Sequence, residues 1–286
     1  MSDHRTTTCQ TLPRISAIYY GLLQTGYEYY PYERDAAHLS QVERFIGTGP
    51  KVSFFAAVRQ NTCSVYPYWP RAAILEEATL YIEEKGQRFV GFDAFRNRVL
   101  SASNIAPEEK GDDVWDWIAG FPEALQTILE SDGFQRYLKW ERTWAEAQSR
   151  AGEQGLSLLN GFFQLCSERY GSRLPEITIA LAPIKCVYAS DHYRQGDRLL
   201  FTSGALRLDS IVHECLHLVV HPLVERGDLG GKHQAYPEID ESYYLDRSEA
   251  GYRNAFEEYA VRSLTKAVLR GDAPLDLAWY LAGLTR

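Results

Sequence analysis

The pattern His-Glu-x-x-His at positions 213 to 217 constrains this chain more than any other feature, and it lies inside the apolar segment Ile211–Val220. Residues four apart lie on one face of an α-helix, so His213 and His217 can present imidazole nitrogens to a single zinc ion. Glu214 lies beside that face, where its carboxylate can accept a proton from an attacking water. The pattern therefore predicts a zinc-binding helix, which we expect to end before Pro222.

The same five residues also occur by chance, as two hydrogen-bonded core histidines with a Glu in the first turn of a helix. The surroundings favour the metal site, because polar side chains on a helix buried in a core are costly without a partner. The apolar neighbours that would bury this helix are Ile211, Val212, Leu216, Leu218, Val219 and Val220.

Composition narrows the class of protein. With 286 residues, 45% of them apolar and 24% charged, the chain has the make-up of a globular protein of one large or two modest domains. Its net charge of −8 argues against nucleic acid or an anionic membrane as its partner. We expect no membrane span, because no apolar run reaches about 18 residues.

The N-terminal segment and the cysteines indicate the compartment. Residues 1 to 13 lack the apolar run of a secretion signal, so we expect a cytoplasmic protein. The five cysteines are odd in number and form no Cys-x-x-Cys pair. This predicts reduced thiols, not a disulfide framework or a cysteine zinc cluster.

A catalytic zinc site has three protein ligands, so a third ligand must lie outside the His pair. The metzincin pattern would require Gly at 220, His at 223 and a later methionine turn. This chain has Val220 and Leu223, and Met1 is its only methionine, which excludes that class.

His221 lies one turn beyond His217, but three successive turns of a straight helix do not all reach one tetrahedral ion. Weaker alternatives are His233, Asp240 and Asp246. The better candidates are Glu257 and Glu258, 40 and 41 residues after His217 in an apolar helical pattern. Helical phase places Glu257 nearer the buried stripe, whereas a ligand facing an open cleft favours Glu258, so both alternatives stand.

A His-Glu-x-x-His helix followed by a Glu on a later helix resembles the gluzincin metallopeptidases, in which that Glu completes the zinc site. The resemblance implies Glu258 as the ligand, because Ala255, Phe256 and Leu264 match the apolar positions around the gluzincin Glu. More narrowly, His213–Pro222 and Glu258–Arg262 resemble a bacterial family known chiefly as uncharacterised zinc peptidases. That family favours Asn where this chain has His221.

These residues predict a cofactor and a reaction. Zn²⁺ would activate water, and Glu214 would transfer its proton to the leaving amine of a peptide or protein substrate. Arg262 would orient Glu258. Candidate donors to the oxyanion are Tyr243, Tyr244, Tyr252 and His233.

The expected fold is a mostly helical α+β protein. Helical patterns fill residues 1–152, the helical N-terminal region, and include Phe134–Ala151. A zincin-like metal-binding region, 153–286, follows, with a helix at Gly155–Tyr170 and a small antiparallel pair of strands at Glu176–Pro183 and Arg198–Thr202. The segment Ser190–Asp197 between those strands is predicted to be a polar loop.

Two other functions compete with the peptidase. The protein could be a catalytically inactive zinc-binding module with a regulatory or interaction role, in which protein fills the fourth metal position. It could also be a helical scaffold in which the pattern is accidental. The sequence leaves the substrate, the cleavage mode and the oligomeric state open.

Overall fold

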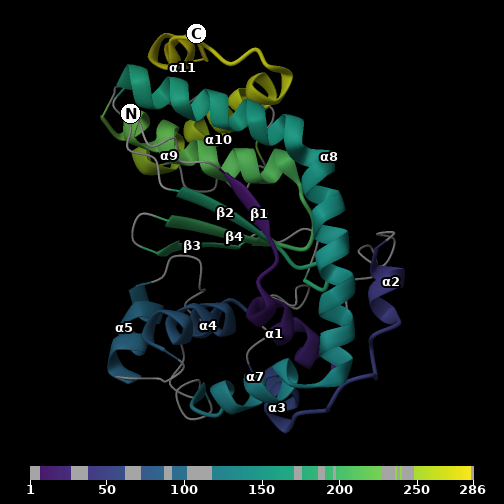
Figure 1. Ribbon diagram of the computed structural model, residues 1–286. Helices are drawn as coiled ribbons and strands as arrows, with labels where there is room; N and C mark the ends of the chain where they lie inside the picture. Colours follow the sequence, from purple (N-terminus) through teal and green to yellow (C-terminus); the bar gives the residue numbers. More distant parts are fainter. Residues whose placement is uncertain are drawn as a thin grey trace. The chain divides into compact units, whose positions relative to one another are not determined.

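A computed structural model of the chain describes residues 7–26, 38–61, 72–86, 92–101, 118–170, 176–185, 191–195, 198–226, 236, 239 and 248–284. This part is mostly helical and contains a four-stranded mixed sheet, so the α+β prediction is confirmed at that level (Figure 1). None of the helices in these ranges has both the length and the apolar character to cross a lipid bilayer.

The chain forms two compact units, and each is discontinuous in sequence. The first unit comprises Met1–Thr7, Ala151–Glu176 and Arg207–Arg286, and the second comprises Thr8–Arg150 and Ile177–Leu206. We expected the strands to accompany the metal-binding region, but they belong to the second unit. The reason is that an N-terminal strand pairs with them.

The second unit is built on helices whose apolar faces form one large core. Pro13 begins the first of them, as its fixed φ and missing N–H favour, and every residue from Ile15 to Gln24 is buried. Val52–Val58, which periodicity left as helix or strand, falls mostly in a helix. The helices are α1 (Pro13–Gln24), α2 (Leu39–Glu43), α3 (Ser53–Asn61), α4 (Ala73–Lys85), α5 (Phe92–Ser101), α7 (Phe121–Leu129) and the first part of α8 (Asp132–Tyr170).

Helix α8 corrects the prediction of two helices at Phe134–Ala151 and Gly155–Tyr170, because it is one helix of 39 residues. The glycines at 152 and 155 favoured a break between two helices, because glycine destabilises a helix interior. Gly155 has a packing role instead: a side-chain carbon there would overlap the Leu208 side chain. The glycine permits a close approach without interrupting the helix.

The sheet has the strand order β1-β2-β4-β3, with β1 (Thr8–Gln10), β2 (Glu176–Leu181), β3 (Asp191–Gln195) and β4 (Arg198–Ser203). Strand β1 runs parallel to β2, and β3 runs antiparallel to β4. The expected polar loop between the two predicted strands is therefore wrong over β3. The sequence of β3 lacks the alternation of polar and apolar residues that predicts a strand. One of its polar residues, Asp191, is nevertheless buried.

A buried ionic cluster joins α4 to this sheet. The ammonium of Lys185 lies 2.6 Å from Glu76 Oε1, 2.6 Å from Asp191 Oδ2 and 2.9 Å from Thr202 Oγ1, and all four residues are buried. Burial alone would lower the pKa of Lys185, but Asp191 and Glu76 raise it above its ordinary value. Tyr19 also donates a hydrogen bond to Glu76. Every charge in the cluster thus has a partner of opposite sign.

We expect Lys185→Met to lower the free energy of unfolding by about 3 to 5 kcal/mol, because two buried carboxylates lose the cation that they share. Urea denaturation at neutral pH measures this loss. Lys139→Met, at an exposed position, is the matched control and should change stability by less than about 0.5 kcal/mol. Equal effects of the two variants would contradict the prediction.

Helix α8 is joined to α1 through a buried acid. Glu141 Oε1 accepts hydrogen bonds from Ser16 Oγ at 2.6 Å and from the Tyr137 hydroxyl at 3.2 Å. Burial raises the pKa of Glu141 to about 8, although both hydrogen bonds oppose the shift. The side chain therefore carries a proton in the folded protein at neutral pH.

This pKa predicts a pH-dependent stability. Between the ordinary Glu value of 4.5 and about 8, the folded state holds a proton that the unfolded state lacks, so the stability contributed by Glu141 falls as pH rises. Glu141→Gln should remove that dependence. The difference in free energy of unfolding, variant minus wild type, should therefore increase by about 3 to 4 kcal/mol between pH 5 and pH 8. Urea denaturation across this range tests it, with the exposed Glu146→Gln as control; parallel curves would refute it.

The first unit contains the second part of α8, α9 (Leu208–Arg226), α10 (Glu249–Arg270) and α11 (Leu277–Leu284). Helices α9 and α10 pack against each other. Helix α9 continues past Pro222, where we expected it to end. The proline costs the hydrogen bond that its missing N–H would have made, and Arg226 Nε donates to the Pro222 carbonyl at 2.8 Å in the final turn.

Candidate metal centre

Helix α9 carries the His-Glu-x-x-His residues on its less buried side. Its buried residues follow a stripe with four-residue spacing along the helix. His213, Glu214 and His217 lie beside this stripe and are partly exposed. The stripe consists of Ile211, Val212, Cys215, Leu216, Val219, Val220 and Val224.

Helix α10 brings the acidic residues to α9. It begins at a Ser248 cap whose hydroxyl accepts a hydrogen bond from Gly251 N at 3.1 Å, and it ends at Gly271, whose φ of 79° is the left-handed conformation that glycine adopts most easily. Ala255, Phe256 and Ala260 are among its fully buried residues. This burial fixes the rotation of α10 about its axis.

Potential ligand atoms of three residues converge between the two helices: the Nε2 atoms of His213 and His217 and the two oxygens of Glu258. His213 Nε2 lies 3.3 Å from His217 Nε2, and 3.4 Å from Glu258 Oε2. Glu258 Oε1 lies 3.4 Å from His217 Nε2. A tetrahedral zinc ion with bonds of about 2.0 to 2.1 Å separates its ligand atoms by about 3.3 to 3.4 Å. The three residues thus have the donor types and the spacing that fit a zinc ion.

The two adjacent glutamates lie in different environments. Glu258 belongs to the three-residue cluster, whereas Glu257 Oε1 is 2.7 Å from His217 Nδ1, on the opposite side of that imidazole ring. Glu257 Oε2 is 2.8 Å from His221 Nδ1. Sequence reasoning gave Glu257 only the role of an alternative ligand, and it missed these two contacts. The four-residue spacing of His217 and His221 was the available signal, since it places both rings along one face.

The contacts in the cluster favour the charged form of His217 and the ionised forms of Glu257 and Glu258. Burial lowers the pKa of His217, but hydrogen bonds to Glu257 and Glu258 outweigh burial and raise it to about 9. Burial raises the pKa of Glu258, yet the two imidazoles hold it well below its ordinary value. The pKa of Glu257 is also lowered, against burial, by His217 and His221. Perturbed titrating groups of this kind concentrate at functional sites.

The other predicted residues differ in how the structure places them. Glu214 is partly exposed, and no hydrogen bond or ion pair reaches it from the described part of the chain. Arg262 Nε lies 3.7 Å from Glu258 Oε2, one turn along α10, where it can orient that carboxylate. Tyr252 lies on α10 six residues before Glu258 and so on a different face of the helix. His233, Asp240, Tyr243, Tyr244 and Asp246 lie outside the described residues.

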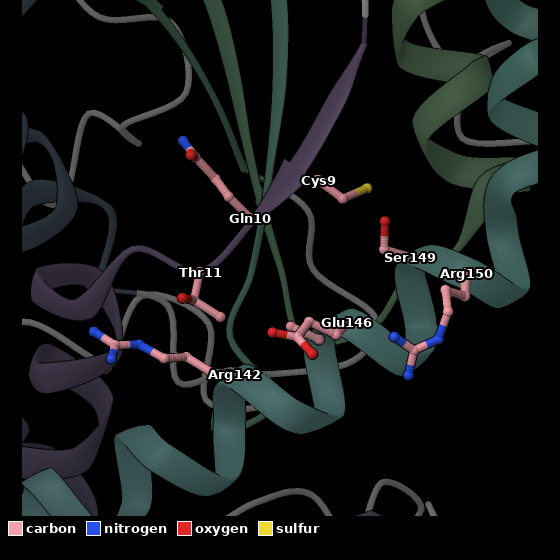
Figure 2. Close-up of a pocket in the computed structure, with 8 residues that line it drawn as sticks. Cys9, Gln10, Thr11, Arg142, Glu146, Ser149 and Arg150 are labelled. Carbon is pink, nitrogen blue, oxygen red and sulfur yellow. The ribbon is translucent and has the colours of Figure 1, made fainter.

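The second unit contains a separate pocket of about 470 Å³ between β1 and α8 (Figure 2). In Figure 2 the Cys9 thiol points toward Ser149. Burial raises the pKa of Cys9 to about 11, against the hydrogen bond from Ser149, so the sulfur is a protonated thiol at neutral pH and a weak nucleophile. The lining residues are Cys9, Gln10, Thr11, Arg142, Ala145, Glu146, Ser149 and Arg150.

No protein-family model matches this chain, and neither a curated protein nor a solved structure matches it. The functional interpretation therefore depends on the geometry of the metal centre and on the chemistry of its side chains.

Proposed function

We propose that His213, His217 and Glu258 bind one zinc ion and that the protein is a zinc metallopeptidase of the gluzincin type. The observation that carries this proposal is that His213 Nε2 and His217 Nε2 lie 3.3 Å apart and that each lies 3.4 Å from one oxygen of the Glu258 carboxylate, distances that suit the ligand shell of a tetrahedral zinc ion. Two neutral imidazoles and a carboxylate are ligands that zinc accepts in catalytic sites.

A bound zinc ion would lower the pKa of a coordinated water and polarise the carbonyl of the substrate. Glu214, next to His213, accepts the proton of the attacking water and delivers it to the nitrogen of the leaving amine. Its carboxylate is suited to this role because no other described residue holds it in a hydrogen bond. Arg262, whose Nε lies 3.7 Å from Glu258 Oε2, helps to orient that carboxylate.

An open metal position favours catalysis over a purely structural site. Among the described residues the cluster holds three ligand groups and no fourth, which is the ligand number of catalytic zinc sites. His221, the nearest additional imidazole on α9, directs its Nδ1 to Glu257 instead. Among the described residues the inactive zinc-binding module, which needs a fourth protein ligand, therefore has less support; its other candidate for that position, His233, lies outside them.

Zinc content tests the metal site directly. We expect the purified protein to hold about one zinc per chain after dialysis, measured by mass spectrometry of the metal, and Glu258→Gln to weaken zinc affinity by at least about 100-fold. Glu249→Gln, which removes an exposed carboxylate from the same helix, should leave the affinity unchanged. A wild-type protein that retains no zinc would refute the site.

Glu214→Gln separates binding from turnover. The variant should keep its zinc, because Glu214 lies outside the ligand cluster, and should lose about 10²- to 10⁴-fold in kcat, because the proton acceptor is gone. A library of internally quenched peptides supplies the assay. If the zinc-loaded wild type cleaves none of these peptides, the proposal of a peptidase gives way to the zinc-binding module.

A further inference from the structure

Glu257 uses both of its carboxylate oxygens on imidazoles from successive turns of α9. Oε1 meets His217 Nδ1 at 2.7 Å, and Oε2 meets His221 Nδ1 at 2.8 Å. An ionised carboxylate only accepts hydrogen bonds, so each imidazole must carry its hydrogen on Nδ1. In the neutral ring of His217 the lone pair then lies on Nε2, the atom that faces His213 and Glu258.

The two contacts also fix the plane of the carboxylate. A carboxylate held by one hydrogen bond can still rotate about its terminal bond, whereas two bonds in fixed directions prevent that rotation. Glu257 is only 8% exposed, so water competes weakly for its oxygens. The side chain of His221 is 57% exposed, yet it supplies the second of the two bonds.

We propose that Glu257 and His221 form a positioning pair that sets the tautomer and the orientation of His217 and thereby strengthens zinc binding. This inference rests on the proposed function, because it assumes that His217 Nε2 is a zinc ligand. In it, Glu257 acts on the metal only through His217, and His221 acts only through Glu257. Carboxylates placed behind a ligand histidine in this way change metal affinity without touching the metal.

Glu257→Gln tests the first link of the pair. Glutamine has nearly the same shape but one acceptor oxygen, so it cannot accept from both Nδ1 atoms. We expect zinc affinity, measured by competition with a chromophoric chelator, to fall by about 10- to 100-fold. Glu249→Gln, at an exposed position in the first turn of α10, is the matched control. An unchanged affinity in Glu257→Gln would overturn the inference.

His221 tests the second link at a position where folding is not at risk, because its side chain is largely exposed. His221→Leu removes the donor and should weaken zinc binding on the order of three- to tenfold. His221→Asn should restore most of the affinity, because its amide nitrogen is as many bonds from Cβ as Nδ1 is. Equal affinities of the Leu variant and the wild type would overturn the role of His221.

The double variant shows whether the two residues act in series. If His221 acts through Glu257, His221→Leu should cause no further loss in the Glu257→Gln protein, and additive losses would refute this order. The same titration separates this inference from the proposed function. A wild-type protein without zinc affinity would contradict both the proposed function and the positioning pair. A wild-type protein that binds zinc, with an affinity that neither substitution changes, would contradict only the positioning pair.

Discussion

The first unit depends on the way α10 packs against α9, because that contact places two carboxylates on either side of one imidazole. Buried apolar residues on both helices fix their rotation, and Glu257 and Glu258 point to different nitrogens of His217 as a result. A cluster of two imidazoles and two partly buried carboxylates is stable only when each group faces a partner. Either a proton or a metal ion can provide the positive charge that these groups share, and the spacing of the ligand atoms suits the metal.

The sequence alone predicts part of this centre, the histidine pair, but not which glutamate joins it. Local rules place His213 and His217 on one face of one helix, since that requires only the period of the helix. They could not decide between Glu257 and Glu258, because the answer depends on how α10 is rotated against a helix 40 residues earlier in the chain. The resemblance to gluzincins implied Glu258, and the structure places Glu258 in the cluster. The bonds of Glu257 to two histidines depend on the same long-range contact and were missed.

The fold shows the same division between local and long-range information. The periodicity predicts helices at Ile15–Gln24 and Leu245–Arg270, and α1 and α10 lie close to those ranges. Helix α8, in contrast, was divided at two glycines, of which Gly155 packs closely against Leu208. Strand β1 has three residues and strand β3 contains buried Asp191, so neither has the apolar alternation that marks a strand. Strand β1 forms because it pairs with β2, far away in the sequence, whereas β3 pairs with the neighbouring strand β4. Asp191 is buried in β3 because Lys185 neutralises it.

One feature of α10 limits how the metal centre can vary. Glu257 and Glu258 are consecutive, so about 100° of helical rotation separates the directions in which they leave the backbone. The supporting carboxylate and the candidate ligand therefore belong to one rigid piece of chain. A one-residue insertion earlier in α10 would turn both acids away from the ring at once, and no single compensating side chain could replace them. Sequences related to this chain should therefore vary in residue type around the two acids far more readily than in helix length before them.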